Sequence, residues 1–246
     1  MMSIKNLLPF SLFFSIFVTQ LCAQDHVYDD LLILYVDEDY EKCLDKSERY
    51  TDKDKTRRDP LPYLYLSMCN FEMSKMEKYV TDPDFKRVAS NALKNAEKFR
   101  KKDKEMEFFA NYEDYWSELN TVAMETGFNY MELDELSKAK RQFDRMAGYY
   151  PENAGAWLML ALSQYRAKLV RDGDESMEAF QKAYDAITDL DRLPKDQQRL
   201  LREGIIRYAE FKKEAGGIEE ARRIMELGKD QFTENLEFKG LYDVLN

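Results

Sequence analysis

The stretch Ala139-Lys-Arg-Gln-Phe143-Asp-Arg-Met146-Ala-Gly-Tyr-Tyr-Pro151-Glu-Asn-Ala-Gly-Ala-Trp157-Leu-Met-Leu160-Ala161 decides the fold of this chain. On both sides of its proline, small and large apolar residues recur every three or four positions, which is the spacing of one face of an α-helix. Proline is poorly tolerated inside a helix and commonly follows the end of one. The stretch therefore predicts the end of one amphipathic helix, a turn at Pro151, and a second helix that opens on Trp157.

Helical spacing also dominates the chain on either side of this stretch. Glycine and proline are few, with 9 and 6 copies, and they fall between the periodic segments, where turns are expected. Pro60 and Pro62 suit the first turn of a helix. We expect helices at 27–36, 40–50, from 60 onward, after 83 and, as one long helix, at 104–133, with later turns at 171–175 and 216–217 and a last helix at 235–245.

The order of residues around Pro151 resembles the boundary between two tetratricopeptide (TPR) repeats. The resemblance covers roughly residues 60–231 and is strongest at 120–190. Small, aromatic and closing positions of the family are matched in three successive units by Gly127, Tyr130, Ala139, Phe143, Met146 and Pro151, then Trp157, Leu160, Ala161, Ser176, Phe180 and Ala183, then Ile205, Tyr208, Ala209, Ala221, Met225 and Gly228.

This resemblance implies an all-α fold, a right-handed superhelical TPR-like α-solenoid of antiparallel helix pairs. Small residues would let helix backbones approach closely, while aromatic rings fill the spaces between pairs. An irregular helical bundle is the alternative. The expected single domain, 24–246, would contain units at about 27–51, 60–102, 104–153, 154–191 and 194–231, and a capping helix at 235–245.

Residues 1–23 have the pattern of a signal peptide. Lys5 precedes an apolar run from Leu7 to Val18, and Ala23 offers a small residue for cleavage. The run is shorter than the roughly 20 residues that span a bilayer. We therefore expect an exported protein, periplasmic or secreted, that does not span the membrane after cleavage. Cys22 leaves a lipoprotein as an alternative, although the bulky Leu21 before it does not suit a lipidation signal.

The formal net charge of −10 argues against nucleic acid as a partner, because an acidic chain is not attracted to phosphate backbones. Basic residues at 57–58 and 98–104 are interleaved with acids and favour a solvated helix face over a docking patch. Cys43 and Cys69 should fall on neighbouring helices. Two buried thiols are the favoured interpretation, and a disulfide between them stays open because an exported compartment permits one.

No pattern in the sequence predicts catalysis. His26 is the single histidine, and no His/Cys/carboxylate cluster has zinc spacing. The Asp37-Glu38-Asp39 run lacks the glycine and the ligand spacing of a calcium loop. Gly216-Gly217 lacks the lysine and hydroxyl that follow a phosphate-binding loop. We expect no metal, no cofactor and no enzymatic activity.

In TPR-like solenoids, the first helices of each pair line an inner surface that usually holds a protein or peptide segment. Projected onto this sequence, the resemblance implies a groove made by three apolar stripes with Arg166 at the rim. The alternative is that a tight superhelix, or the helix at 104–133, covers these stripes and makes them core. The candidate groove residues are Leu61, Leu64, Met68, Met124, Phe128, Met131, Leu158, Leu162, Tyr165 and Arg166.

Taken together, these patterns imply an exported bacterial protein that acts as a protein–protein interaction adaptor or scaffold in the cell envelope. It would work by binding alone, with another protein or a peptide segment as its partner. The alternative is a structural subunit of an envelope or secretion assembly that associates with copies of itself. A third interpretation, an accessory domain of a secreted enzyme complex, requires a catalytic partner chain.

Overall fold

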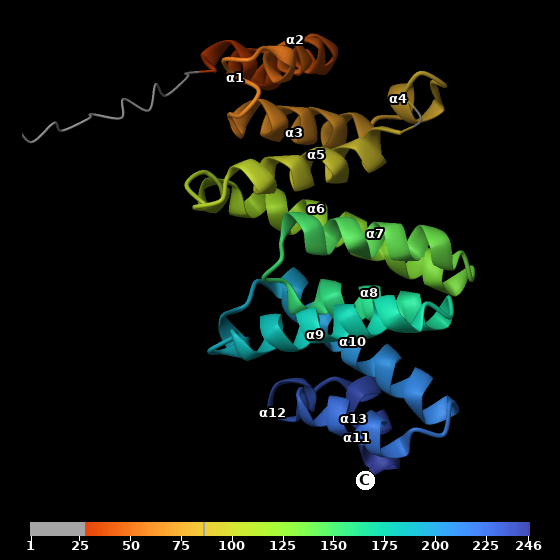
Figure 1. The fold of residues 1–246 in the computed structure, drawn as a ribbon. Coiled ribbons are helices and arrows are strands. Elements are labelled where there is room, and N and C mark those ends of the chain that lie inside the picture. The colour runs from red at the N-terminus through yellow and green to blue at the C-terminus, as the bar shows by residue number, and fades with distance from the viewer. Residues whose placement is uncertain (1–27, 86) are drawn as a thin grey trace, which may run out of the picture.

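The computed structural model describes residues 28–85 and 87–246, and this part of the chain is all helical, with no strand (Figure 1). The expectation of an all-α fold is confirmed. The elements are α1 Asp29–Val36, α2 Tyr40–Asp52, α3 Leu61–Ser74, α4 Glu77–Thr81, α5 Val88–Lys102, η1 Phe109–Tyr112, α6 Glu113–Glu132, α7 Leu136–Tyr149, α8 Ala154–Arg166, α9 Val170–Asp185, η2 Leu190–Arg192, α10 Lys195–Glu214, α11 Ile218–Glu226, α12 Lys229–Phe232 and α13 Leu236–Leu245, where η1 and η2 are short 3₁₀ helices.

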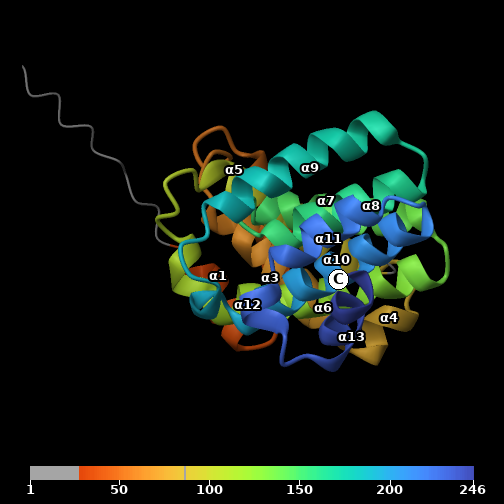
Figure 2. The ribbon, with the colours of Figure 1, turned by 90° about the horizontal axis from the view of Figure 1, so that it is seen from below.

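The helices run back and forth in a stack that begins with α1 and α2 and ends with α11 to α13 (Figure 1). Most helices pack against the next long helix in the chain, as α2 does on α3 and α7 does on α8. Other contacts reach further: α5 packs on α7, and α10 packs on both α8 and α6. Seen along the stack, α10 lies near the middle of the molecule and α9 at its edge (Figure 2). Because α10 packs on both α6 and α8, it covers surfaces of these two helices that would otherwise be exposed.

Several predicted helices are confirmed close to their expected bounds. The helix expected at 40–50 is α2, and the helix expected after Pro60 begins at Leu61 with Pro62 in its first turn. The helix expected after Pro83 begins at Val88, and the short α4 lies in the connection between α3 and this helix. These starts were predictable because proline and the apolar spacing act locally.

The single long helix predicted at 104–133 is wrong, because α6 begins only at Glu113. The Asp103 carboxylate accepts hydrogen bonds from the backbone N–H groups of Phe108, at 3.2 Å, and Phe109, at 2.8 Å. Met106, which lies between Asp103 and Phe108 in the sequence, has a left-handed backbone with φ of 56°. A side chain that binds nearby backbone donors offers an alternative to the helix, so residues 103–112 fold as a compact turn before α6.

The turn predicted at 171–175 is also wrong, because α9 already begins at Val170 and Gly173 lies inside it. A Cβ atom added at Gly173 would lie 2.6 Å from the ring of Tyr165. Gly173 therefore allows the Tyr165 ring to pack closely on α9, and it does not mark a turn. The chain instead reverses at 167–169, immediately after α8.

Four hairpins, α1–α2, α6–α7, α8–α9 and α10–α11, reverse through the same turn. In each, the residue with a left-handed backbone follows the first helix, and the next N–H donates to the carbonyl five residues back. This is the Schellman geometry that satisfies the last carbonyls of a helix. The left-handed residues are Glu38, Asp134, Lys168 and Gly216, with φ of 59°, 54°, 62° and 83°, and the bonds are Asp39 to Leu34 at 2.9 Å, Glu135 to Tyr130 at 2.8 Å, Leu169 to Gln164 at 2.9 Å and Gly217 to Lys212 at 2.8 Å.

The turn geometry predicts that Lys168→Gly stabilises the protein. A left-handed backbone costs a residue with a side chain roughly 1 kcal/mol more than glycine, so the free energy of unfolding should rise by up to about 1 kcal/mol. Lys94→Gly is the matched control, because Lys94 is exposed in the middle of α5, where glycine costs about 1 kcal/mol. Urea denaturation of both variants checks the signs. If both substitutions lower stability equally, the turn assignment at Lys168 is wrong.

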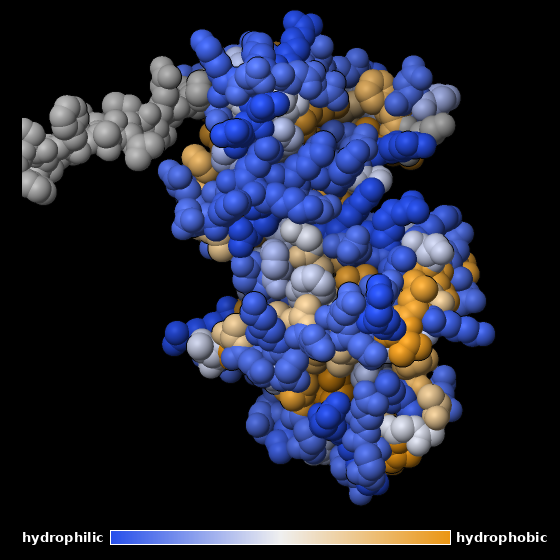
Figure 3. All heavy atoms as spheres, in the orientation of Figure 1, coloured by the Kyte–Doolittle hydropathy of each residue, from blue (hydrophilic) through white to orange (hydrophobic). Residues whose placement is uncertain are grey.

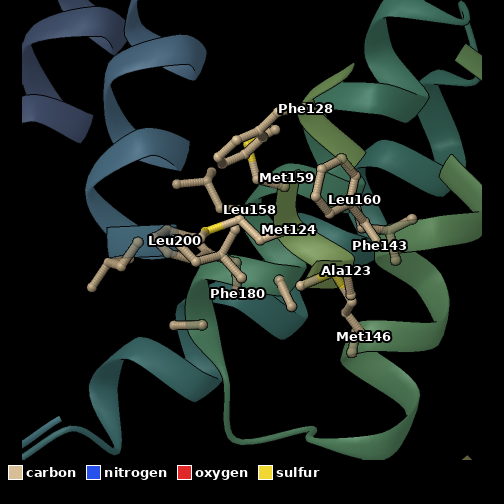
Figure 4. Packing of buried hydrophobic residues seen from close by; sticks show 14 of the residues in the cluster. Ala123, Met124, Phe128, Phe143, Met146, Leu158, Met159, Leu160, Phe180 and Leu200 are labelled. Atoms are coloured by element: carbon tan, nitrogen blue, oxygen red, sulfur yellow. The ribbon is translucent and has the colours of Figure 1, made fainter. Parts of the chain in front are cut away.

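The buried core runs through the stack, and its centre is built from α6, α7, α8, α9 and α10 (Figure 4). Phe143 of α7 is fully buried, and a Cβ atom added at Gly127 of α6 would lie 2.5 Å from its ring. The Phe143 ring therefore packs on the glycine of the preceding helix, within the α6–α7 hairpin. Trp157 differs, since it is only partly buried against the core and its Nε1 donates to the carbonyl of Pro151 at 2.8 Å.

Cys43 of α2 and Cys69 of α3 are free thiols with no exposed surface. A hydrogen bond with Cys43, together with burial, raises the pKa of the Cys69 thiol. Because both thiols are shielded from solvent and the reactive thiolate of Cys69 is disfavoured, both cysteines should resist iodoacetamide in the folded protein and react after unfolding in guanidinium. Peptide mass mapping of protein purified without reductant checks this. Recovery of a disulfide-linked peptide that contains both residues would contradict it.

Candidate binding site

The groove predicted from the apolar stripes is not an open surface in the structure. Seven of its residues are buried, and three of them appear among the core side chains in Figure 4. These apolar stripes are therefore part of the core, which is the alternative that the sequence left open. The buried residues are Leu64, Met68, Met124, Phe128, Met131, Leu158 and Leu162, and Leu61, Tyr165 and Arg166 are partly buried.

On α6 and α8 the physical reason is the position of α10, which covers the inner faces of these two helices, whereas the stripe on α3 belongs to a helix that packs on α2 and α5. A Cβ atom added at Gly204 of α10 would lie 3.2 Å from Leu158. The guanidinium of Arg207 lies 4.6 Å from the ring centroid of Phe128. Charged side chains close the edge of this contact, as in the ion pair of Arg199 with Glu125 at 2.6 Å. An open groove here would require α10 to leave α6.

Tyr165 and Arg166, at the edge of the predicted groove, are engaged within the protein. The Tyr165 ring stacks on Phe211 at 6.4 Å, and its hydroxyl donates to Asp174 at 2.7 Å. Arg166 pairs with the exposed carboxylate of Asp134 at 3.0 Å. An exposed ion pair of this kind contributes about 0–1 kcal/mol, so Arg166 forms an ordinary surface ion pair.

A different concave site lies where residues 103–112 and the start of α6 face the start of α10. We call it the α6/α10 cleft. It has a volume of about 520 Å³, and the connections before α6 and before α10 lie on the same side of the stack in Figure 1. Its lining includes three aromatic residues, Phe109, Trp116 and Tyr150, and three acids, Glu113, Asp114 and Asp196.

The floor of the cleft is a stack of aromatic rings. Phe109 and Trp116 are buried and nearly parallel, with centroids 4.7 Å apart and an angle of 6° between the rings. Tyr150 meets Phe109 edge-on at 4.9 Å, and Phe99 stacks behind Trp116 at 5.3 Å. The indole Nε1 of Trp116 donates to the carbonyl of Phe109 at 2.9 Å. These contacts hold the turn at 103–112 against α6 and make the floor preformed.

One wall of the cleft is held by a buried polar network. The Asp196 carboxylate is 8% exposed and accepts hydrogen bonds from the Ser117 hydroxyl at 2.8 Å and from Asn120 Nδ2 at 2.7 Å. The Asn120 Oδ1 in turn accepts from Tyr149 at 3.3 Å and from Asn153 at 3.2 Å. Satisfied networks of this kind fix the relative positions of the elements they join. Here they join α6, α7, α10 and the residue that caps α8.

The cleft is acidic. Glu113 and Asp114 are exposed in the first turn of α6. Among the described residues, no lysine or arginine forms an ion pair with Glu113, Asp114 or Asp196. The one cation in the lining, Arg192, pairs with Asp189 at 3.2 Å. Sequence reasoning missed this site because its residues come from three separate segments and each acid suits a helix N-terminus on its own.

Within residues 28–85 and 87–246, no group of histidine, cysteine and acidic side chains is arranged to hold a metal ion. In the same part of the chain, every helix is too short or too polar to cross a bilayer. The predicted signal peptide at 1–23 and His26 lie outside the described residues. The described lining of the cleft thus offers aromatic faces and carboxylates as its chemical groups.

Comparison with family models, with curated proteins and with solved structures finds no match to this chain. The described residues place it in the class of all-helical proteins.

Proposed function

We propose that this chain is a right-handed TPR-like α-solenoid of antiparallel helix pairs and that it acts as an exported protein–protein adaptor or scaffold in a bacterial cell envelope. It holds another protein by contact alone, and no bond is made or broken. Two features support the repeat architecture. Four hairpins share one turn geometry, and the ring of Phe143 packs on Gly127 at positions that match the family pattern.

The observation that carries the binding role is the α6/α10 cleft. Binding sites are typically concave, preformed and apolar, with a few placed polar groups. The cleft has a floor of stacked rings and a carboxylate fixed by a buried network. Its described lining contains no histidine, cysteine or lysine, so acid–base chemistry there would rest on its carboxylates and the Tyr150 hydroxyl. The stacked rings and the fixed carboxylate are suited to binding a segment of a partner protein.

Site-specific photo-crosslinking tests this function. A photoreactive residue replaces Ala110, which is exposed and lines the cleft, and in a control it replaces Glu237, which is exposed on α13. After irradiation in the cell of origin, Ala110 should yield an adduct with a different protein that Glu237 does not yield. The absence of any adduct at Ala110, or the same adducts at both positions, would contradict the adaptor role.

A second candidate function, self-association, is favoured by a separate observation. Large apolar residues are exposed at the turns of three hairpins, namely Leu133, Leu169, Val170 and Ile218. In Figure 3, hydrophobic patches lie at the right edge of the lower half, on the side where these turns lie in Figure 1. Exposed apolar patches often mark interfaces. Light scattering of the purified protein at increasing concentration tests this candidate, and a strict monomer would contradict it.

A further inference from the structure

We propose that the α6/α10 cleft receives an arginine side chain of the partner segment. The inference rests on the proposed adaptor function and adds the chemistry of the ligand. It follows from the charge of the cleft, from the shape of its floor, and from the acceptor capacity of one buried carboxylate.

The charge of the cleft calls for a cation. Glu113, Asp114 and Asp196 all line it. The cation in the lining, Arg192, already pairs with Asp189, and Arg100, which lies 6.0 Å from the Phe109 ring, pairs with Glu152 at 2.7 Å. An apolar side chain bound here would remove water from unpaired carboxylates, which is costly.

Asp196 has capacity for a further donor. A carboxylate has about four lone-pair sites for hydrogen bonds, and Asp196 accepts two in the described structure, both from neutral groups, Ser117 and Asn120. It is 8% exposed and lies in the cleft lining. Charge-assisted hydrogen bonds are stronger than neutral ones, so a guanidinium is a better additional partner for Asp196 than another neutral donor.

The ring of Tyr150, which is partly exposed in the cleft lining, favours a flat cation over a compact one. A guanidinium stacks on aromatic faces and hydrogen-bonds a carboxylate with two parallel N–H groups, whereas an ammonium is a compact point charge. The protein already contains such contacts, with Arg207 over Phe128 at 4.6 Å and Arg100 over Phe109 at 6.0 Å. A divalent cation fits less well, because no acidic cluster in the described residues has metal-binding geometry.

The test uses the peptide acetyl-Ala-Arg-Ala-amide as the probe and the fluorescence of Trp116 as the signal. The chain has two tryptophans, so a Trp157→Phe background assigns the emission to Trp116. Citrulline in place of arginine keeps the shape of the side chain and removes its charge. We expect the citrulline peptide to bind at least tenfold more weakly and a lysine peptide several-fold more weakly. Equal affinity for the arginine and citrulline peptides would overturn the proposal.

Substitutions in the protein give an independent measurement. Asp196→Asn removes the charge; its amide oxygen can still accept from Asn120 Nδ2 while its NH2 group donates to the Ser117 hydroxyl, and it should weaken the arginine peptide at least tenfold. Glu113→Gln changes an exposed residue, so it keeps the fold, and it should weaken binding a few-fold. Asp243→Asn on α13 is the matched control and should change nothing. If neither Asp196→Asn nor Glu113→Gln weakens binding, the cleft does not hold the arginine.

The failure of this inference can be told apart from failure of the adaptor function. If Ala110 crosslinks a partner while arginine and citrulline peptides bind alike, only the arginine inference is wrong. If the arginine peptide binds and Ala110 finds no partner, the pocket is correct and the adaptor function is wrong.

Discussion

Phe143→Ala is expected to lower the free energy of unfolding by about 3–5 kcal/mol, the range for removing a buried phenylalanine ring. Phe143 has no exposed surface, its ring packs directly on Gly127, and Phe128 lies 6.3 Å away. A cavity at this point would lie between α6, α7 and α8, where close packing leaves little room for neighbours to collapse. Urea denaturation followed by circular dichroism measures the change.

Leu236→Ala is the control for this prediction, because Leu236 is 86% exposed. Surface substitutions usually change stability by less than about 0.5 kcal/mol. A loss below about 1 kcal/mol for Phe143→Ala, similar to the control, would mean that the ring does not belong to the core.

Gly155→Ala is expected to lower the free energy of unfolding by about 1–3 kcal/mol, the usual cost of overpacking. The added Cβ would lie 2.6 Å from the backbone nitrogen of Leu201 and 2.8 Å from the carbonyl carbon of Leu200. Backbone atoms cannot rotate away as a side chain can, so α8 and α10 would have to separate. Thermal and urea denaturation measure the effect.

Gly240→Ala is the matched control within the same chain. Gly240 lies in α13, and a Cβ atom added there meets nothing within 4 Å. Alanine in a helix is favoured over glycine by about 0.5–1 kcal/mol, so this variant should gain stability. The two substitutions therefore have opposite expected signs. If Gly155→Ala also gained stability, the close contact between α8 and α10 would be absent in solution.

The helices were predictable from the sequence because their signals are local. Apolar spacing and Pro60 locate α3, and the same spacing on either side of Pro151 locates α7 and α8. The late start of α6 was not predictable in this way. Residues 104–112 keep helical spacing, and only the hydrogen bonds that Asp103 accepts turn the chain there.

The candidate groove could not be judged from the sequence because its exposure depends on a contact between distant segments. Met124 and Phe128 have the spacing of a helix face, but whether that face is open depends on α10, which lies two helix pairs later in the chain. The α6/α10 cleft was missed for a similar reason. Asp196 and Trp116 belong to different helices, and no pattern within either one predicts that they line the same cleft.

The central claim is that α10 closes the inner faces of α6 and α8, so that binding falls to the α6/α10 cleft. Amide hydrogen exchange measured by mass spectrometry tests it most directly. The account predicts that the buried segments of α6, α8 and α10 exchange together and at the slowest rate in the protein, because they open only on global unfolding. Much faster exchange throughout α10 than in α6 and α8 would contradict it, since α10 would then leave the groove open.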